Sequence, residues 1–348
     1  MGWPKLRILL HLKDRLSLFT SSPARAAVLR ATLLSSSPPS EQTLHHLLLL
    51  SLHSPVSASS CVSSLLSRLY SSPDAHVSLK CLLALHYLLS RGTFILHGQI
   101  LSSLAARNCL NLSSFRDCSD PSAWQLSSLV RWYASFLELV LLASKRLSFF
   151  YASASRLESW DGQVSEKWIS GLGNSELLSE TEGLADVLEC ACKMPSMSGH
   201  DLVCEITSKV IEDYGATRCE ILKRVHEISD RIDGVLMGDG AIDVDVDGFG
   251  RVLERIRDCE ANAYVVFGNK RNNDGLWEAV AHTNRKVAEV VERRARKSIV
   301  IYAESVRLDA SGWCYGQQNQ LIGGGGGGGH NSDGLVGRDL IQIPVMAA

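Results

Sequence analysis

One stretch of the sequence, Ser72 to Leu96, predicts a helix that must be surrounded by other helices. Ser72 can cap such a helix, Pro73 suits its first position, and Gly92 can adopt the left-handed turn that ends it. Four polar residues fall on one narrow stripe: His76, Lys80, Tyr87 and Arg91. Apolar residues occupy nearly all of the remaining surface, so we expect amphipathic helices on most sides. The stretch therefore predicts a layered, all-α domain.

Helical patterns also cover most of the remaining chain, and no segment has the pattern of a strand. Further helices are expected at residues 5–19, 23–32, 40–53, 61–70, 99–107, 120–150, 176–193, 201–235, 249–269 and 275–306. Residues 54–60 are expected to form a loop, and residues 160–174 a hinge. Consecutive helices with short connections favour a solenoid-like array.

The charge distribution divides the chain into a basic front and an acidic back. Residues 1–160 contain fifteen Lys and Arg against seven Asp and Glu, although the whole chain has a net charge of −2. We expect an N-terminal module at 1–158, a helical extension at 159–306 and a disordered, glycine-rich tail at 307–348. The basic front indicates contact with an anionic surface, either a membrane or a nucleic acid, or else a solvated helix face.

Cysteine usage and the apolar segments indicate a cytosolic chain. Ten cysteines are scattered without a C-x-x-C pair, which is typical of thiols that stay reduced. Charged residues at 13–15 cut short the apolar start, so no signal peptide is expected. Glu138 and Lys145 interrupt the apolar segment at 120–150, so we predict no membrane span.

Four blocks of sequence carry a family resemblance. They are DAHVSLKCLLALHYLLSRGTFIL at 74–96, NCLNLSSFRD at 108–117, WQLSSLVRWYASFLE at 124–138 and KRNNDGLWE at 270–278. Through these blocks the chain resembles the ENTH/ANTH-domain family, and within it the clathrin assembly proteins of plants. The resemblance implies an all-α, right-handed superhelical solenoid with a helical extension. It also implies a membrane, rather than a nucleic acid, as the anionic partner.

The resemblance implies a site for phosphatidylinositol 4,5-bisphosphate. In the family, a basic residue near the end of one helix and a basic cluster at the start of the next bind its phosphates. Arg30 matches the first position, but residues 40–43, with the sequence SEQT, replace the cluster. The phosphoinositide site is therefore degenerate. Arg25, Lys13 and His45 could form a diffuse substitute, but we favour the interpretation that they belong to a solvated helix face.

A calcium-loop pattern is the other candidate site. Asp243, Asp245, Asp247, Gly248 and Glu254 match D-x-D-x-D-G-x5-E, which can surround a calcium ion with carboxylates. A glycine occupies the position that usually pairs two such loops, and no second loop exists. We interpret the match as an accidental feature of an acidic, solvated loop, and we expect no metal or other cofactor.

Catalytic motifs are absent from the sequence, which contains no G-x-S-x-G, H-E-x-x-H or phosphate-binding G-x-x-x-x-G-K. His86 is interpreted as a core histidine, and Trp132 and Tyr133 as packing residues. In the tail, Leu340, Ile341 and Ile343 resemble the apolar part of a clathrin box whose acidic end is missing.

The sequence thus leads to two hypotheses from different classes. The first is a non-enzymatic endocytic adaptor that binds phosphoinositide membrane, clathrin and a SNARE helix. It would act on the cytoplasmic face of membranes, at clathrin-coated pits and vesicles and at the Golgi apparatus. The second is a helical protein-interaction scaffold that has lost phosphoinositide binding. The basic front favours the first hypothesis, and residues 40–43 favour the second.

Overall fold

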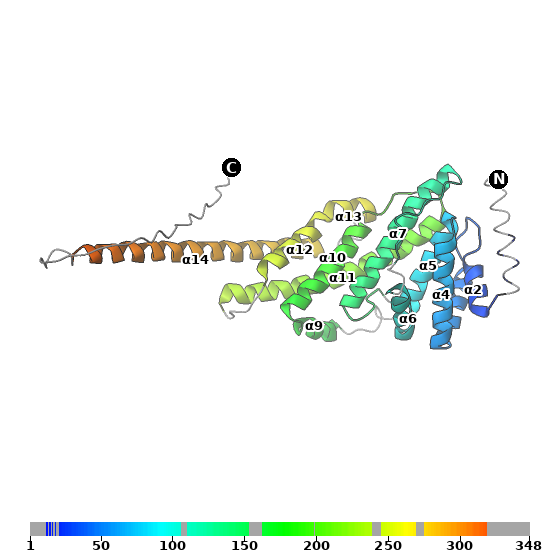
Figure 1. Ribbon diagram of the computed structural model, residues 1–348, viewed down its shortest axis with the longest axis horizontal. Coiled ribbons are helices and arrows are strands. Elements are labelled where there is room, and N and C mark those ends of the chain that lie inside the picture. The colour runs from blue at the N-terminus through cyan, green and yellow to red at the C-terminus, as the bar shows by residue number, and fades with distance from the viewer. Residues whose placement is uncertain are drawn as a thin grey trace, which may run out of the picture. The chain divides into compact units, whose positions relative to one another are not determined.

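The fold is an array of α-helices (Figure 1). The computed structural model describes residues 12, 14, 16, 18, 21–105, 110–152, 162–197, 199–238, 245–268 and 275–318, and none of these lies in a strand. The helices are α2 (Pro23–Ala31), α3 (Glu41–Leu52), α4 (Pro55–Ser71), α5 (Ala75–Arg91), α6 (Phe94–Ala105), α7 (Pro121–Arg146), α9 (Gly162–Ser170), α10 (Asn174–Ala191), α11 (Asp201–Met237), α12 (Val246–Asp258), α13 (Glu260–Phe267) and α14 (Leu276–Gln318). The all-α prediction is confirmed. The predicted helix at 5–19 and the predicted disordered tail lie largely outside the described residues.

Serine and aspartate side chains cap the N-terminal ends of several helices. Ser40 accepts a hydrogen bond from the Thr43 amide, so the predicted cap of α3 is confirmed. The predicted loop at 54–60 is wrong, because helix α4 already starts at Pro55. Ser54 accepts a hydrogen bond from the Ser57 amide at 3.1 Å, and proline suits the first helical turn.

The central helix is α5, and its ends differ from the prediction. Asp74, rather than Ser72, is the cap, and its Oδ1 accepts the Val77 amide at 3.0 Å. Gly92 has φ −75° and ψ 162°, so it does not adopt the predicted left-handed turn. A Cβ at this position would lie 2.3 Å from the Leu88 carbonyl oxygen, which explains the glycine. The chain then starts a new helix, α6, at Phe94.

Helix α5 is enclosed by other helices, as its narrow polar stripe predicts. It packs against α4 and α7 and also contacts α2, α3, α6 and α11. The polar stripe is more buried than expected, because Lys80 is 2% exposed and Tyr87 is 7% exposed. Lys80 remains compatible with burial because its ammonium group is hydrogen-bonded, as the next subsection describes.

The second half of the array contains a helix where a hinge was predicted. Helix α9 occupies most of residues 160–174, and α10 begins directly after it with the Glu176 side chain accepting the Gly173 amide at 3.0 Å. The predicted helix at 249–269 is divided at Cys259 into α12 and α13. Helix α14 continues to Gln318, beyond its predicted end.

Helix α7 is long and apolar enough to cross a membrane by length and composition, and it is the one such helix in the described part of the chain. Within the fold, 61% of its most apolar window is buried. Tyr133 and Phe136 are fully buried, and α7 packs against α5 on one side and α10 on another. These contacts are those of a core helix.

The chain forms two compact units, residues 1–293 and residues 294–348. The first contains all helices from α2 to α13 and the start of α14, and the second contains the rest of α14. The predicted boundary at 158/159 therefore lies inside the first unit. Whether residues 1–158 form a module of their own stays a prediction, which the Discussion develops.

Candidate functional site

The residues of the predicted lipid site lie on α2 and α3, which pack against each other. Arg30 is exposed in the last turn of α2, and Arg25 is exposed in its first turn. His45 is exposed on α3, about one turn after its start. Lys13 lies outside the described residues. The structure thus leaves Arg30, Arg25 and His45 accessible to a ligand.

The start of α3 is poorly suited to a phosphate. The Ser40 side chain occupies the Thr43 amide, and the Thr43 hydroxyl donates to the Ser40 carbonyl oxygen at 2.7 Å. The Glu41 side chain is exposed in the first turn, where its charge complements the positive end of the helix dipole. The same charge repels a phosphate at this helix end. The degenerate cluster therefore offers Arg30 little support.

Two other cations stabilise the loop between α2 and α3. The Lys80 Nζ donates to the Leu33 carbonyl oxygen at 2.8 Å and to the Ser35 Oγ at 2.6 Å. The Arg68 Nε donates to the Thr32 Oγ1 at 2.8 Å. Sequence reasoning placed Lys80 on a solvated stripe and missed this role, because the partners lie about 45 residues away in the chain.

We expect replacement of Lys80 with methionine to change the pH dependence of stability. Burial lowers the pKa of Lys80 from 10.5 to about 8, against a smaller opposing effect of Asp74. The unfolded chain therefore binds this proton more tightly than the folded chain. As the pH rises from about 8 to about 10.5, the wild-type free energy of unfolding should increase relative to that of the variant, by about 3 kcal/mol at most.

Urea denaturation of both proteins across this pH range measures the difference directly. Buried thiols such as Cys61 titrate in both proteins, so their effect cancels in the comparison. A difference in stability that stays constant from about pH 7 to about pH 10.5 would contradict the assignment of a buried, titrating Lys80.

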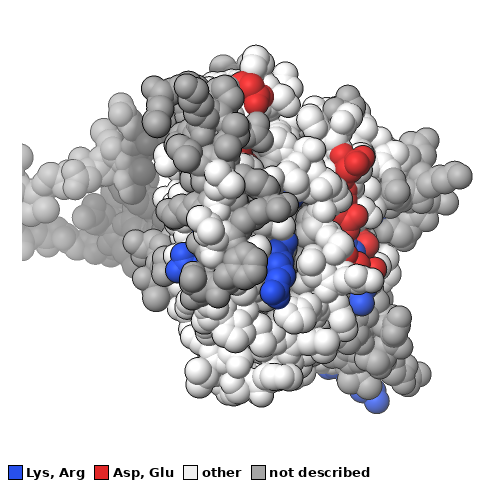
Figure 2. Space-filling model, turned by 90° about the vertical axis from the view of Figure 1, so that its right-hand side faces the viewer, with Lys and Arg blue, Asp and Glu red and all other residues white. Residues whose placement is uncertain are grey.

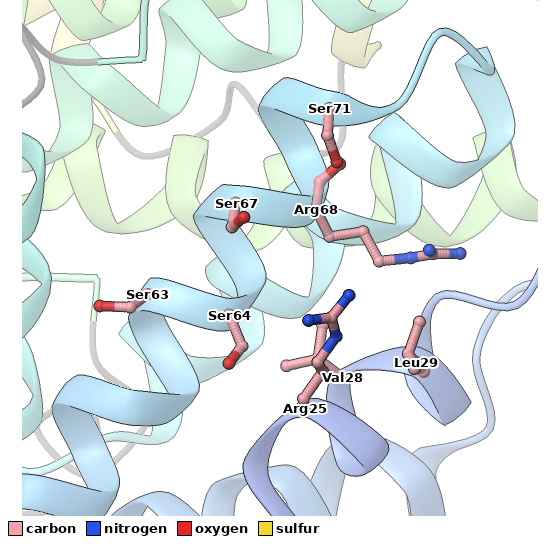
Figure 3. Close-up of a pocket in the computed structure, with 8 residues that line it drawn as sticks. All are labelled: Arg25, Val28, Leu29, Ser63, Ser64, Ser67, Arg68 and Ser71. Carbon is pink, nitrogen blue, oxygen red and sulfur yellow. The ribbon is translucent and has the colours of Figure 1, made fainter. Parts of the chain in front are cut away.

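A groove of about 370 Å³ lies between α2 and α4 (Figure 3). Arg25 from α2 and Arg68 from α4 extend into the space between the two helices, and α4 adds a row of hydroxyl groups. The row consists of Ser63, Ser64, Ser67 and Ser71. Arg68 is paired with Asp14 at 2.9 Å, whereas Arg25 has no ion pair with any described residue. The groove can therefore bind a small anion through one guanidinium and several hydroxyls.

The surface around α2 and α4 has no continuous basic patch among the described residues. Figure 2 shows this face with Lys and Arg in small separate patches, a largely uncharged surface between them, and Asp and Glu toward one edge. Among the described residues, basic side chains thus do not gather on this face. The count of charged residues in the sequence could not show this, because it does not include the direction in which each helix presents its side chains.

The calcium-loop pattern falls on the start of helix α12. Asp245 is the cap of this helix, and its Oδ1 accepts the Gly248 amide at 2.8 Å. Asp247 and Glu254 lie within the helix, seven residues apart, which separates them by about 10 Å along the axis. A calcium loop needs a sharp turn at its glycine, whereas Gly248 also lies within this helix. Asp243 lies outside the described residues.

In the described part of the chain, no group of three or more His, Cys, Asp or Glu side chains is placed to hold a metal ion. Two of the buried thiols, Cys61 and Cys81, are poor nucleophiles, because burial raises the pKa of Cys61 to about 11 and that of Cys81 to about 12.

His86 is a core histidine, as the sequence predicts. It is 1% exposed, its Nδ1 lies 2.8 Å from the Tyr133 hydroxyl, and its Nε2 lies 2.9 Å from Oδ2 of Asp213. These three residues come from α5, α7 and α11, so they join helices of the front and back halves. Tyr133 is fully buried and Trp132 packs against the core, so the prediction that both are packing residues is confirmed.

The region from α2 into α11 corresponds to a known domain. Residues 24–213 match the ANTH domain. The chain belongs to the ANTH domain family. The resemblance stated from the sequence is thereby confirmed, and the ANTH domain includes Arg30, the start of α3, the groove between α2 and α4, and the His86 cluster.

Several proteins of Arabidopsis thaliana are similar to this ANTH-domain chain. It is 35% identical over 285 residues to "Putative clathrin assembly protein At4g40080", which covers 79% of this chain and 76% of the relative. It is 28% identical over 230 residues to "Putative clathrin assembly protein At5g10410", which covers 63% of this chain and 64% of the relative. A third relative, "Putative clathrin assembly protein At2g25430", is 36% identical over 113 residues, and these make up only 17% of its length.

The predicted clathrin-box residues Leu340, Ile341 and Ile343 lie outside the described residues. The structure therefore adds nothing to the sequence pattern at these positions, and they stay a prediction.

Proposed function

We propose that this ANTH-domain protein is a non-enzymatic adaptor that promotes clathrin coat assembly on phosphoinositide-containing membranes during endocytosis. The observation that carries the proposal is the similarity to "Putative clathrin assembly protein At4g40080", which extends over 79% of the chain, together with the ANTH domain match at residues 24–213. The adaptor would act on the cytoplasmic face of membranes, at coated pits and vesicles and at the Golgi apparatus.

The proposed mechanism requires binding but no chemistry. Arg30 and Arg25 are the exposed cations of α2, and they can contact the phosphates of phosphatidylinositol 4,5-bisphosphate with little burial. His45 and Lys13 are proposed as additional contacts. Partner helices such as those of SNARE proteins would dock on the helical array, and Leu340, Ile341 and Ile343 would contact clathrin.

A second candidate is a helical interaction scaffold without phosphoinositide binding. The observation that favours it is the start of α3, where Ser40 caps the helix and the exposed Glu41 side chain repels phosphate. Arg68 and Lys80 are also unavailable as substitutes, because both hold the loop between α2 and α3. The two candidates differ in one measurable property, which is specific binding to anionic vesicles.

We expect replacement of Arg30 with glutamate to weaken vesicle binding by about tenfold, because one cationic contact becomes a repulsive one. The measurement is co-sedimentation of the full chain with vesicles that contain or lack phosphatidylinositol 4,5-bisphosphate, at two salt concentrations. Lys193→Glu is the matched control, since it makes the same charge change on an exposed residue just after α10.

The opposite change should strengthen binding. Replacing Ser40 and Gln42 with lysine restores two cations beside α3, and we expect an increase in affinity of about tenfold or more. Unchanged binding of this variant would show that the family's lipid position is not used here. A wild-type chain that binds neither type of vesicle at either salt concentration would favour the scaffold.

A further inference from the structure

Five large apolar side chains are exposed near one another at one end of the first helices. Phe94 is 87% exposed, Val56 79%, Ile95 55%, Leu49 49% and Leu52 40%. We call these five residues the apolar tip. They come from three helices: the end of α3, the start of α4 and the start of α6.

The topology brings these helix ends together. Residues 53–54 connect α3 to α4, residues 72–74 connect α4 to α5, and residues 92–93 connect α5 to α6. Because α4 packs against both α3 and α5, such short connections make each pair antiparallel. The end of α3, the start of α4, the end of α5 and the start of α6 therefore share one end of the bundle, and α6 packs beside α4 (Figure 1).

The apolar tip differs from the single exposed apolar residues on α11 and α13. Met237 and Val265 are as exposed, at 81% and 86%, but they stand on separate helices, α11 and α13. Single exposed apolar residues are ordinary on protein surfaces, whereas a group of them marks a surface that meets an apolar partner. None of the five tip residues lines the groove between α2 and α4.

The stretch of sequence that forms the tip carries almost no negative charge. Between residues 42 and 116 the sequence contains a single acidic residue, Asp74, and it caps the far end of α5. A surface without carboxylates can approach anionic head groups without electrostatic repulsion.

Cations flank the tip on two further helices. Arg91 is exposed at the end of α5, directly before α6. The end of α7 is also close, because the ring of Phe150, which follows α7, lies 4.8 Å from that of His97 in α6. Lys145 is exposed in the last turn of α7. Exposed apolar side chains with neighbouring cations, on a stretch whose one carboxylate lies at the far end of α5, match the interface of an anionic bilayer.

Helix α3 connects the tip to the predicted lipid site. Its exposed face runs from Gln42 through His45 and Leu49 to Leu52 over a length of about 15 Å. A flat membrane that contacts the start of α3 can therefore also contact the tip if α3 lies along its surface.

We propose that the apolar tip inserts into the head-group region of an anionic bilayer, with α3 lying along the membrane surface. The inference rests on the proposed function, since it requires that the protein reaches a membrane. It adds an apolar contact that can compensate for the missing basic cluster at residues 40–43. Arg91 and Lys145 would contact lipid phosphates beside the inserted side chains.

The test is vesicle co-sedimentation of the full chain with Phe94→Ser and Val56→Ser combined, on vesicles of phosphatidylcholine with phosphatidylserine. Both side chains are exposed, so the variant should keep its helical circular dichroism and its thermal midpoint. We expect its vesicle affinity to fall by about tenfold or more. The matched control combines Met237→Ser and Val265→Ser, and its affinity should stay within about twofold of the wild type.

The possible results separate the inference from the proposed function. If the wild type and the tip variant bind vesicles equally, the membrane contact is overturned and the tip becomes a surface for docking a protein, while the adaptor proposal stands. An equal loss of vesicle affinity in the control variant would also overturn the proposed membrane contact, because any exposed apolar residue would then have the same effect. A wild-type chain that binds no anionic vesicles overturns the adaptor proposal itself.

Discussion

Replacing Arg224 with methionine is expected to lower the free energy of unfolding by about 3–5 kcal/mol. Arg224 is fully buried on α11, where its Nη2 donates to the Glu180 Oε2 at 2.7 Å and its Nη1 to the Glu220 Oε2 at 2.8 Å. Glu180 is 5% exposed and comes from α10. Methionine would fill a similar space but would leave the Glu180 carboxylate buried without its cation. Urea denaturation of the wild type and the variant gives the difference.

Two further variants separate lost charge pairing from lost packing. Combining Arg224→Met with Glu180→Leu removes the orphaned carboxylate, so part of the lost stability should return. Lys209→Met is the control, because Lys209 pairs with the well-exposed Glu212 at 3.1 Å, and its effect should stay below about 1 kcal/mol. A loss below about 1 kcal/mol for Arg224→Met would mean that the buried pair contributes little.

The pattern of apolar residues was sufficient to predict most of the helices and the enclosure of α5, although α9 occupies the predicted hinge. It depends on local periodicity, which the sequence displays directly. The ends of the helices were harder to predict, as Ser54 and Gly92 illustrate. A serine-rich stretch resembles a loop unless the Ser-Pro pair is interpreted as a cap and first turn, and Gly92 is required by a close approach to Leu88 rather than by a positive φ.

The candidate site was predictable only in part. The exposure of its residues follows from the pattern of a single helix, whereas their contacts involve residues that are distant in the sequence. Arg30 and His45 were correctly expected to be accessible, since each lies on the polar side of a short amphipathic helix. Lys80 was misinterpreted, because its polar partners are in a loop that only the tertiary fold brings close. The apolar tip was missed for a similar reason: it is assembled from the ends of three helices, and no single periodic pattern contains it.

Truncation of the chain after residue 158 is expected to abolish cooperative folding of the N-terminal part. Helices α10 and α11 cover the face of α5 and α7 that would then be exposed. The Trp132 Nε1 donates to the Cys190 carbonyl oxygen at 2.9 Å, and the Tyr151 hydroxyl lies 3.2 Å from the Thr217 Oγ1. The partner of His86, Asp213, would also be lost.

The size of the expected loss of stability follows from the burial of the face of α5 and α7 that α10 and α11 cover. Tyr133 and Phe136 are fully buried, and each fully buried large apolar side chain contributes roughly 1.5–3 kcal/mol. The stability of a whole domain is only about 5–15 kcal/mol, so exposing several such side chains and orphaning His86 exceeds what a fragment can tolerate. We therefore expect residues 1–158 to show no sigmoidal urea transition, and residues 1–293, the first compact unit, to show one.

The comparison of these two fragments decides between a modular and an integral N-terminal half. The ANTH match ends at residue 213, so it includes α10 and the first part of α11, which cover α7 and contact α5. A cooperative transition of residues 1–158 with the midpoint of the full chain would establish an independent module. Loss of the transition would instead mean that the helices of the front half are held in place by the back half, so that a partner that displaces α10 or α11 would also disturb α5 and the tip.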